Sequence, residues 1–367
     1  MLIRSLKLRN FRNYEYLGIE FEKDYNIIYG NNAQGKTNMI EAMFMCASGR
    51  SHRTSKDMEL LRTGSPEYYI ELLLEKEENL STIEIRYARD ERKRISINEI
   101  PLKKTGELMG RLNAVIFSPE DLLLVKEGPS ERRRFLDMTI SQLRPSYFFD
   151  LQQYARILFQ RNSLLKEIEN KKELMETIEI WNQHLVKTGS KIMKARRELL
   201  EKLNEKASIR HDKLTRGAEQ LKIGYLPSFN IDHEDGIEVI EKKFERALSQ
   251  AVSREIFKGT TLYGPQRDDY DIILNGMSTK IYGSQGQQRT SVLSIKLAEI
   301  DIMKEETGEY PVLLLDDVLS ELDNRRQEYL FESIDSIQTF ITCTDRSFFR
   351  KTGVNARFIN IAGGQVV

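Results

Sequence analysis

A phosphate-binding pattern occupies residues 30–37, which read G-N-N-A-Q-G-K-T. The spacing G-x-x-x-x-G-K-[ST] is typical of a loop whose backbone N–H groups surround nucleotide phosphates at the start of a helix. In such a loop Lys36 reaches the outer phosphates and the Thr37 hydroxyl holds a magnesium ion. Gly30 and Gly35 stand where a Cβ would block the phosphate. The alternative interpretation is a chance Gly-Lys turn.

The flanking residues have the order that this loop requires. Residues 25–30, YNIIYG, predict a short buried strand, and residues 38–49, NMIEAMFMCASG, carry apolar residues at helical spacing. A strand, a glycine-rich turn and a helix therefore follow one another. The predicted nucleotide contacts come from Gly30, Asn31, Asn32, Ala33, Gln34, Gly35, Lys36, Thr37 and Asn38.

Two adjacent carboxylates end the apolar run YPVLLLDD, residues 310–317. A buried strand that delivers a carboxylate to its C-terminal end can hold magnesium opposite a phosphate loop. We expect Asp316 to bind the metal through water, and Asp317 to orient or deprotonate the attacking water. An acidic strand end that merely begins a loop is the alternative. The predicted catalytic residues are thus Asp317, Asp316 and Lys36, and the predicted magnesium ligands are Thr37 and Asp316.

A second helix start with small residues lies at GSQGQQR, residues 283–289. Ser284, Gly286 and Gln287 are expected to come immediately before an amphipathic helix, which makes another anion-binding end. One loop already surrounds the nucleotide, so this second end is expected to complete the site of a partner subunit. The S-x-G-Q pattern resembles the signature motif of ABC-type ATPases, and SELD (320–323) fits their dimer-interface loop. Ordinary helix capping by Ser and Asp is the alternative for both.

The two halves of the site are 280 residues apart, counted from Lys36 to Asp316. A kinase or GTPase would have both within one short α/β unit, so a subdomain is inserted between them. Residues 68–75, 81–89 and 93–100 alternate as strands of an antiparallel meander. From Pro145 to Leu221 the composition is that of long helix. In that segment Leu185, Ile192, Leu199 and Leu203 lie near one helical face.

These elements predict an α/β fold, an ABC/SMC-type P-loop ATPase head with an inserted helical arm domain. The length of 367 residues suits roughly two domains. We assign residues 1–125 and 255–367 to the head, which both ends of the chain build, and residues 126–254 to a mainly helical arm.

Charge gives no overall indication of a nucleic-acid partner, because Lys plus Arg and Asp plus Glu are both 56. Locally, residues 185–216 carry ten Lys or Arg against four acids. This excess indicates either a solvated helix face or a surface for DNA phosphates. The candidate DNA contacts are Lys187, Lys191, Lys194 and Arg197.

The two cysteines, Cys46 and Cys343, have no metal-like spacing and read as buried thiols. The N-terminus alternates apolar and basic residues instead of forming the apolar core of a signal peptide. No apolar run reaches the length of about 18 residues that a membrane helix needs. The sequence therefore predicts a soluble, cytoplasmic protein without a membrane partner.

Six ordered segments over nearly the whole chain resemble the RecF family of bacterial recombination mediators, relatives of the SMC-type chromosome proteins. They are LKLRNFRNY (6–14), GNNAQGKTN (30–38), FSPEDLLLVKEGPSERRRFLD (117–137), YGPQRDD (263–269), GSQGQQR (283–289) and LLLDDVLSELD (313–323). The resemblance implies a weak, DNA-stimulated ATPase that uses ATP and Mg²⁺ as a switch. It also implies dimerisation on ATP, binding to double-stranded and gapped DNA, and work with RecR and RecO to load recombinase in repair, replication and the SOS response.

By the same resemblance Arg12 and Asn13 approach the nucleotide, with a surface turn as the alternative. Residues 132–134, three arginines, either touch DNA or pair with local acids. The chain departs from the pattern at Asp317 and Asp345, where the wider ABC class has Glu and His, and at Gln266 and Glu127, where RecF-type chains have His and Gly. No Gln of a metal-contacting loop is assigned near FSPEDL.

Two other classes share parts of this chemistry. The ATPase subunit of a membrane transporter has the same head, but would not carry a long Lys-rich insertion. A small-molecule P-loop kinase has no use for a second anion-binding helix start, so Ser284 discriminates between a kinase and a dimerising ATPase.

Overall fold

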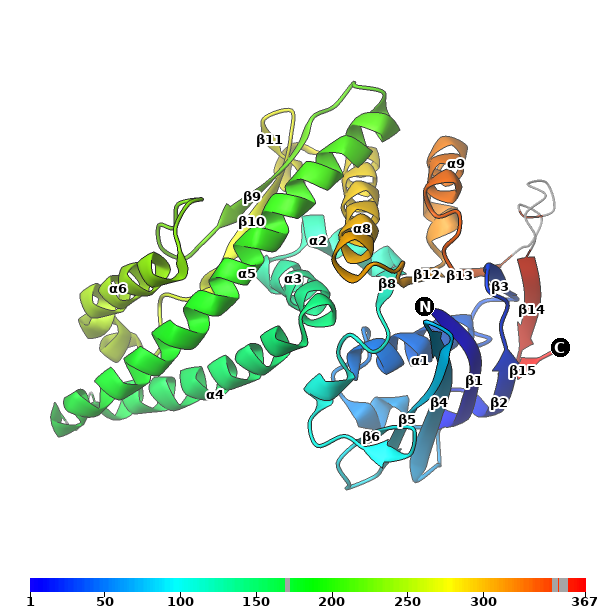
Figure 1. Cartoon of the computed structure of the whole chain (residues 1–367), viewed down its shortest axis with the longest axis horizontal. Coiled ribbons are helices and arrows are strands. Elements are labelled where there is room, and N and C mark those ends of the chain that lie inside the picture. Colours follow the sequence, from blue (N-terminus) through cyan, green and yellow to red (C-terminus); the bar gives the residue numbers. More distant parts are fainter. Residues whose placement is uncertain (169–171, 345–348, 350–355) are drawn as a thin grey trace. The chain divides into compact units, whose positions relative to one another are not determined.

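A computed structural model describes residues 1–168, 172–344, 349 and 356–367 (Figure 1). Contacts divide the chain into a head unit, residues 1–122 with 292–367, and an arm unit, residues 123–291. The arm boundary therefore differs from the sequence assignment, which gave residues 255–291 to the head. The reason is strand pairing, because residues 269–274 are hydrogen-bonded along their whole length to residues 221–226.

A mostly parallel sheet carries the phosphate loop of the head unit. Its strand order is β15-β14-β3-β13-β12-β8, and only β15 runs antiparallel to its neighbour. The strands are β3 (Tyr25–Tyr29), β8 (Ala114–Phe117), β12 (Val312–Asp316), β13 (Thr339–Cys343), β14 (Ala356–Ala362) and β15 (Gln365–Val366). Asp316 is level with Thr342, and Cys343 is level with Tyr29. The carboxyl ends of β12, β13 and β3 thus meet at one edge, where ligands bind in such sheets.

The second sheet of the head unit is antiparallel, in the order β2-β1-β4-β5-β6-β7. Its strands are β1 (Leu2–Phe11), β2 (Tyr14–Glu20), β4 (Glu67–Lys76), β5 (Asn79–Ala88), β6 (Arg94–Ile97) and β7 (Ile100–Pro101). The predicted meander is confirmed as β4-β5-β6. Burial alternates along β1, where Leu6 and Leu8 are buried while Lys7 and Arg9 are exposed. One face of this sheet therefore belongs to the core and the other meets solvent.

Helix α1 (Lys36–Ser48) follows the phosphate loop and lies between the two sheets. It contacts β12 and β13 of the parallel sheet and β4 and β5 of the antiparallel one. This explains why residues 39–48 are buried on every side of the helix, as expected for a core helix. The head unit also contains η1 (Asp57–Leu60), η2 (Thr105–Leu108), η3 (Pro119–Leu122), η6 (Val318–Glu321) and α9 (Asn324–Ser333).

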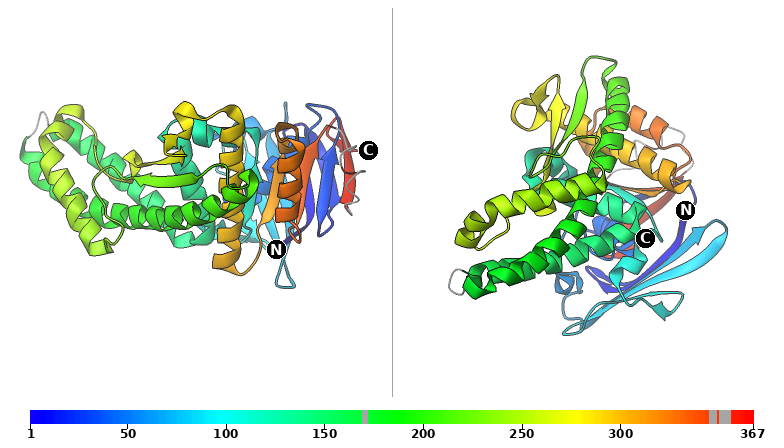
Figure 2. Two further views of the ribbon diagram at one scale, coloured as in Figure 1. Left: turned by 90° about the horizontal axis from the view of Figure 1, so that it is seen from above. Right: turned by 60° about the vertical axis from the view of Figure 1, so that its left-hand side comes forward.

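The arm unit is built on two helices that lie side by side, α4 (Pro145–Ile168) and α5 (Met175–Thr215) (Figure 1, Figure 2). The single helical region expected from the sequence is thus a pair. Its other elements are α2 (Leu123–Lys126), α3 (Pro129–Leu143), η4 (Lys172–Leu174), β9 (Leu221–Leu226), α6 (Ile237–Lys258), η5 (Pro265–Arg267), β10 (Asp269–Leu274), β11 (Met277–Ser278) and α7 (Thr279–Tyr282). Helix α8 (Gln285–Thr307) begins in the arm unit and continues in the head unit.

The predicted apolar face of α5 is confirmed, because Leu185, Ile192, Leu199 and Leu203 are all buried. Within the described ranges, no helix is long and apolar enough to cross a bilayer. Both cysteines are buried free thiols, as expected.

Candidate nucleotide-binding site

The phosphate loop connects β3 to α1 at the carboxyl edge of the parallel sheet. Lys36 is held inside this loop, where its Nζ donates to the carbonyl oxygens of Gly30 at 2.7 Å and Asn31 at 2.8 Å. Burial lowers the pKa of Lys36, while the charges of Asp317 and Asp316 act in the opposite direction. The ammonium is therefore fixed at the place where a P-loop lysine meets the outer phosphates of a nucleotide.

The two motif glycines are required by packing as well as by any ligand. Gly30 has φ 147°, and a Cβ there would lie 2.3 Å from the carbonyl oxygen of Ile361 on β14. Gly35 has φ 117°, and its Cβ would lie 2.7 Å from Asn13 Nδ2. Both φ values lie in the region that favours glycine. The sequence interpretation, in which a Cβ would block the phosphate, gave only part of the reason.

The turn between β1 and β2 clasps the phosphate loop. Asn13 Nδ2 donates to the carbonyl oxygen of Gln34 at 2.8 Å, and Tyr14 donates to that of Gly35 at 2.9 Å. Asn38 Nδ2 donates to Asn13 Oδ1 at 2.8 Å. Asn13 thus lies against the phosphate loop, the region in which its role was predicted.

The acidic strand end faces the start of α1. Asp316 Oδ1 accepts from Thr37 Oγ1 at 2.9 Å and from Thr342 Oγ1 at 2.7 Å. Burial raises the pKa of Asp316, and these two hydrogen bonds oppose that effect by stabilising the charged form. Thr37 and Asp316 are 279 residues apart in the sequence, and the structure places them in direct contact. They are the two residues that the sequence predicted as ligands of one magnesium ion.

This pair fits Mg²⁺, because a hydroxyl and a carboxylate are the hard oxygen ligands that the ion prefers. Among the described residues no group of three or more His, Cys, Asp or Glu gathers. A magnesium ion held by Thr37 and Asp316 would therefore complete its shell with water and phosphate oxygens, which is typical of nucleotide sites.

Asp317 is held in an unusual backbone conformation. Its φ of 55° and ψ of 21° lie in the left-handed region, and the residue is exposed. For a residue other than glycine this costs on the order of 1 kcal/mol, and such strain gathers at functional sites. The Asp317 amide donates to Thr342 Oγ1 at 2.9 Å. Thr342 thus contacts both acidic residues, and the sequence interpretation missed it because FITC reads as an ordinary buried strand.

Arg12 is engaged with protein groups. Its Nε and Nη2 donate to the two carboxylate oxygens of Glu41 at 2.9 and 2.7 Å, and its Nη1 donates to the carbonyl oxygen of Glu59. Glu41 is fully buried on α1 and also accepts from Ser51 at 2.5 Å. Although burial opposes its ionisation, the hydrogen bonds from Arg12 and Ser51 hold the pKa of Glu41 below its ordinary value. Arg12 therefore braces α1 from the β1–β2 turn.

Arg53 is a second residue that sequence reasoning missed. Its Nη1 donates to Asn38 Oδ1 at 3.1 Å and lies 3.4 Å from Glu41. While burial raises the pKa of Asp316, the positive charge of Arg53 lowers it. The Arg53 guanidinium thus lies near the same edge of the parallel sheet as Lys36. Its loop, GRSHRTS, matches no motif by which the sequence could have identified it.

The second predicted helix is confirmed as α8, but it begins at Gln285, so Gly286 and Gln287 lie in its first turn and not before it. Ser284 and Gln287 form a reciprocal cap, in which Ser284 N donates to Gln287 Oε1 at 2.9 Å and Gln287 N donates to Ser284 Oγ at 3.3 Å. Gln287 Nε2 also donates to Glu219. Ser284 is exposed, and Gly286 is half-buried in the first turn. In SELD, Asp323 caps α9 by accepting from Arg326 N.

The candidate DNA residues of the arm divide into two kinds. Lys187 and Lys191 are exposed, and Lys194 lies 3.8 Å from Glu198. Arg197 is only 9% exposed, and its guanidinium donates to the carbonyl oxygens of Asp232 and Asp235. It supports a loop of the arm, so its assignment to a DNA surface does not agree with the structure.

Of the three arginines at 132–134, only Arg134 lies beside a local acid, while the first two contact residues 268 and 269 of a distant segment. Arg132 forms a two-point ion pair with Asp269 at 2.6 and 2.8 Å, and Arg133 donates to the carbonyl oxygen of Asp268. Arg134 lies 3.7 Å from Glu131. Asp345, where the wider ABC class has His, lies outside the described residues.

Comparisons with known proteins agree with this architecture. Residues 2–364 match the family model described as the RecF/RecN/SMC N terminal domain. The chain is 53% identical to the DNA replication and repair protein RecF of Acetivibrio thermocellus and 50% identical to that of Ruminiclostridium cellulolyticum, covering 100% of this chain and 99% of each relative.

Solved structures extend the likeness to three dimensions. The structure of the recombination mediator protein RecF-ATP in the RecFOR pathway is 39% identical, with a TM-score of 0.93 over 100% of this chain and 96% of that chain. An Smc head bound to the C-winged helix domain of ScpA has a TM-score of 0.56 at 16% identity, over 100% of this chain and 97% of that chain. The second likeness concerns the fold alone.

Proposed function

This chain belongs to the RecF family, and from that premise we propose that it is an ATP-controlled DNA clamp of replication and recombinational repair. The single observation that carries the proposal is the meeting of Lys36, Thr37 and Asp316 at one sheet edge, in a chain 53% identical to a RecF over its full length. Family membership also removes the two alternatives, a transporter ATPase subunit and a small-molecule kinase.

Each side chain of the edge has one task. Lys36 binds the outer phosphates of ATP, the backbone of residues 30–38 surrounds them, and Thr37 with Asp316 holds Mg²⁺. Asp317 orients or deprotonates the attacking water, since a carboxylate is needed within hydrogen-bond reach of it. Bound ATP would supply a terminal phosphoryl group, whose loss would weaken the contacts that the nucleotide makes. Mg²⁺ would offset the negative charge of the phosphates.

The exposed start of α8 gives the nucleotide a second use. Ser284 and Gly286 offer a helix N-terminus, which attracts phosphate. We place there the phosphates of the ATP bound to a partner subunit, so that each ATP joins two copies of the chain. Two copies present twice the number of basic contacts, and DNA affinity rises steeply with the number of phosphates neutralised. Hydrolysis is slow, is stimulated by DNA and acts as a release step.

The partners follow from the relatives. A RecF structure is described within the RecFOR pathway, and we extend that setting to this chain, with RecR and RecO as protein partners and gapped or double-stranded DNA as the nucleic acid. The compartment is the cytoplasm. Contacts to phosphate carry no base code, so the clamp recognises a DNA structure and not a sequence.

Sedimentation velocity tests the proposal. With ATP the protein should sediment as a dimer and carry a labelled gapped duplex, whereas with ADP or no nucleotide it should remain smaller and free of DNA. Ser284→Arg should abolish the ATP-dependent dimer yet retain ATP, because Lys36 and Thr37 are unchanged. Ser146→Arg is the matched control, an exposed serine in the first turn of α4. A Ser284→Arg protein that still dimerises with ATP would refute the clamp.

A further inference from the structure

One row of side chains crosses the exposed face of the antiparallel sheet in the head unit. Arg9 on β1 is level with Tyr16 on β2 and with Tyr69 on β4, Tyr69 is level with Arg86 on β5, and Arg86 is level with Arg94 on β6. Directly opposed residues point to the same face, so the five side chains form a continuous line. At about 4.8 Å between strands, the line is about 19 Å long. We call it the arginine–tyrosine row.

Both aromatic rings of this row lie along their strands. Tyr16 is 65% exposed, and its hydroxyl lies 3.1 Å from where a Cβ of Gly18 would be, so the ring lies over that glycine. The Tyr69 hydroxyl donates to Glu71 Oε2 at 2.7 Å, which holds its ring along β4. The guanidinium of Arg86 lies 4.8 Å from the centre of the Tyr69 ring. Rings placed in this way on a sheet are platforms on which unpaired bases stack.

The row is positively charged, with three arginines and no acid. The guanidinium of Arg9 makes no hydrogen bond or ion pair with the residues that the structure describes. Arg86 lies 3.5 Å from Glu84, and Arg94 pairs with Glu91 in the exposed turn that follows β5. In the neighbouring row Lys7 and Glu71 neutralise each other at 2.8 Å. The available cation of this face is therefore Arg9, which stands between the two tyrosines.

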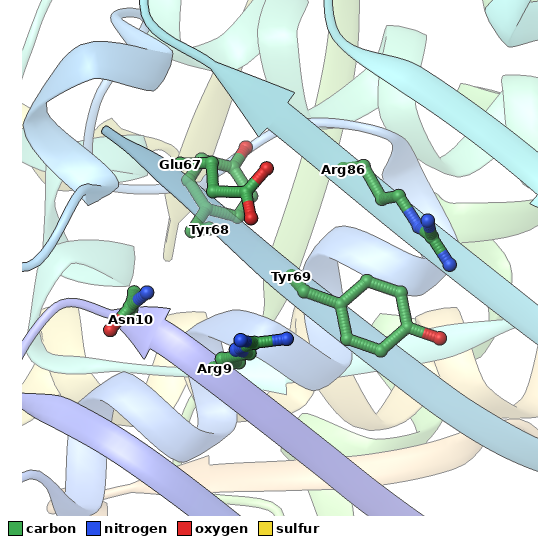
Figure 3. A pocket seen from close by; sticks show the side chains of 6 residues that line it. All are labelled: Arg9, Asn10, Glu67, Tyr68, Tyr69 and Arg86. Atoms are coloured by element: carbon green, nitrogen blue, oxygen red, sulfur yellow. The ribbon is translucent and has the colours of Figure 1, made fainter. Parts of the chain in front are cut away.

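A pocket of about 180 Å³ opens beside Arg9. It is lined by Arg9, Asn10, Glu67, Tyr68, Tyr69 and Arg86. Figure 3 shows Tyr69 between Arg9 and Arg86, which is their order across β1, β4 and β5, so an aromatic residue stands between two arginines. A guanidinium binds phosphate or stacks on a base, and a tyrosine ring accepts any base.

We propose that the arginine–tyrosine row binds single-stranded DNA. A single strand alternates a flat base with a charged phosphate, which is the alternation of Tyr16, Arg9, Tyr69 and Arg86 across the strands. Duplex DNA keeps its bases stacked inside and has no use for the rings, and an acidic protein segment would need the cations alone. The inference rests on the proposed DNA-binding function and adds to it a site for the unpaired strand, separate from the lysines of the arm.

The double variant Arg9→Ala/Tyr16→Ala tests the row, because both side chains are exposed and Arg9 has no partner to lose. Fluorescence anisotropy is measured in ATP with a labelled thymidine oligonucleotide of about 20 nucleotides, longer than a typical single-strand site. Loss of one stacked base should weaken its binding about tenfold or more. Loss of one phosphate contact should also reduce the slope of log affinity against log salt by about 0.7.

The control variant is Arg111→Ala/Tyr310→Ala, which removes the same two residue types elsewhere in the head unit. Its oligonucleotide affinity should equal that of the unchanged protein. For the row variant, duplex affinity and the ATP-dependent dimer should remain within about twofold, since neither uses the rings. Unchanged oligonucleotide binding would overturn the inference, and so would an equal loss of duplex binding, which would show a surface for phosphates only.

Failure of the proposed function would look different. In that case the unchanged protein would bind neither oligonucleotide nor duplex with ATP, and the row would fall with it. A 5-bromouracil oligonucleotide adds an independent measurement, because photocrosslinks should map to Tyr16 or Tyr69. Crosslinks confined to the arm unit would place the strand elsewhere and reject the row.

Discussion

Thr342→Val should reduce ATP hydrolysis by more than its effect on stability explains, because Thr342 positions Asp316 and Asp317. Valine has nearly the shape of threonine, so the change removes a hydroxyl from β13 and little else. That hydroxyl donates to Asp316 at 2.7 Å and accepts from the Asp317 amide at 2.9 Å. The variant therefore removes a donor from Asp316, the carboxylate proposed to hold Mg²⁺, and an acceptor from the backbone of Asp317, the residue proposed to activate water.

The size of the effect follows from these two bonds. A hydrogen bond to a charged group contributes about 1.5–3 kcal/mol, which corresponds to a loss of about tenfold to a hundredfold in the rate of ATP hydrolysis. The Mg²⁺ concentration for half-maximal activity should rise, because the pKa of Asp316 is raised by burial and is lowered by this hydroxyl. The free energy of unfolding should decrease by about 1–3 kcal/mol, because the Asp317 amide loses its acceptor.

Thr339→Val is the matched control. Thr339 lies on the same strand, is fully buried and donates to the carbonyl oxygen of Ile337 at 2.9 Å, without contact to either acid. It should lose stability by a similar amount and retain ATP turnover. Turnover is measured by phosphate release over a Mg²⁺ series, and stability by urea unfolding. If Thr342→Val hydrolyses ATP normally, or if both variants lose activity equally, the assigned role of Thr342 is wrong.

Two further predictions concern the same unit. Asp317→Asn should bind ATP, dimerise and stay on DNA, because an amide cannot deprotonate water; rapid release in a dissociation assay would place the base elsewhere. Glu41→Gln should lower stability by about 3 kcal/mol, because it leaves Arg12 without its buried carboxylate, whereas exposed Glu15→Gln, which removes a surface pair with Arg62, should change it by less than about 1 kcal/mol. The depressed pKa of Glu41 means that its contribution is present above the unfolded pKa of about 4.3 and is lost as the pH falls through the folded pKa. Unfolding of both variants across acidic pH checks this, and an unchanged acid dependence in Glu41→Gln would contradict it.

The sequence predicted those parts of the site that a local pattern determines. Lys36 and Thr37 follow from one eight-residue spacing, and Asp316 follows from a buried strand that ends in a carboxylate. Thr342 and Arg53 could not be found in this way. Their roles arise because β13 lies between β3 and β12, and because the loop after α1 returns to its first turn. Such contacts depend on the order of strands in the sheet, which no short segment encodes.

The misplaced features have a similar physical cause. Arg197 was grouped with lysines because charge counting along a helix does not tell a guanidinium that binds backbone carbonyls from one in solvent. The sequence assignment gave residues 255–291 to the head, whereas pairing of β10 with β9 joins them to the arm. The sequence pattern predicts whether a segment is a helix or a strand, whereas its hydrogen-bond partners decide which unit it joins.

The β1–β2 hairpin connects the two activities assigned to the head unit. Its turn holds Asn13 and Tyr14 against the phosphate loop, and its strands carry Arg9 and Tyr16 on the exposed face. A nucleotide that orders the phosphate loop therefore acts on the same hairpin that a single strand would contact. Coupling between two ligands is reciprocal, so if ATP raises the affinity for a thymidine oligonucleotide, the oligonucleotide must raise the affinity for ATP by the same factor. The shared hairpin gives that coupling a short covalent path, whereas basic residues on the arm would have to act through the pairing of two subunits.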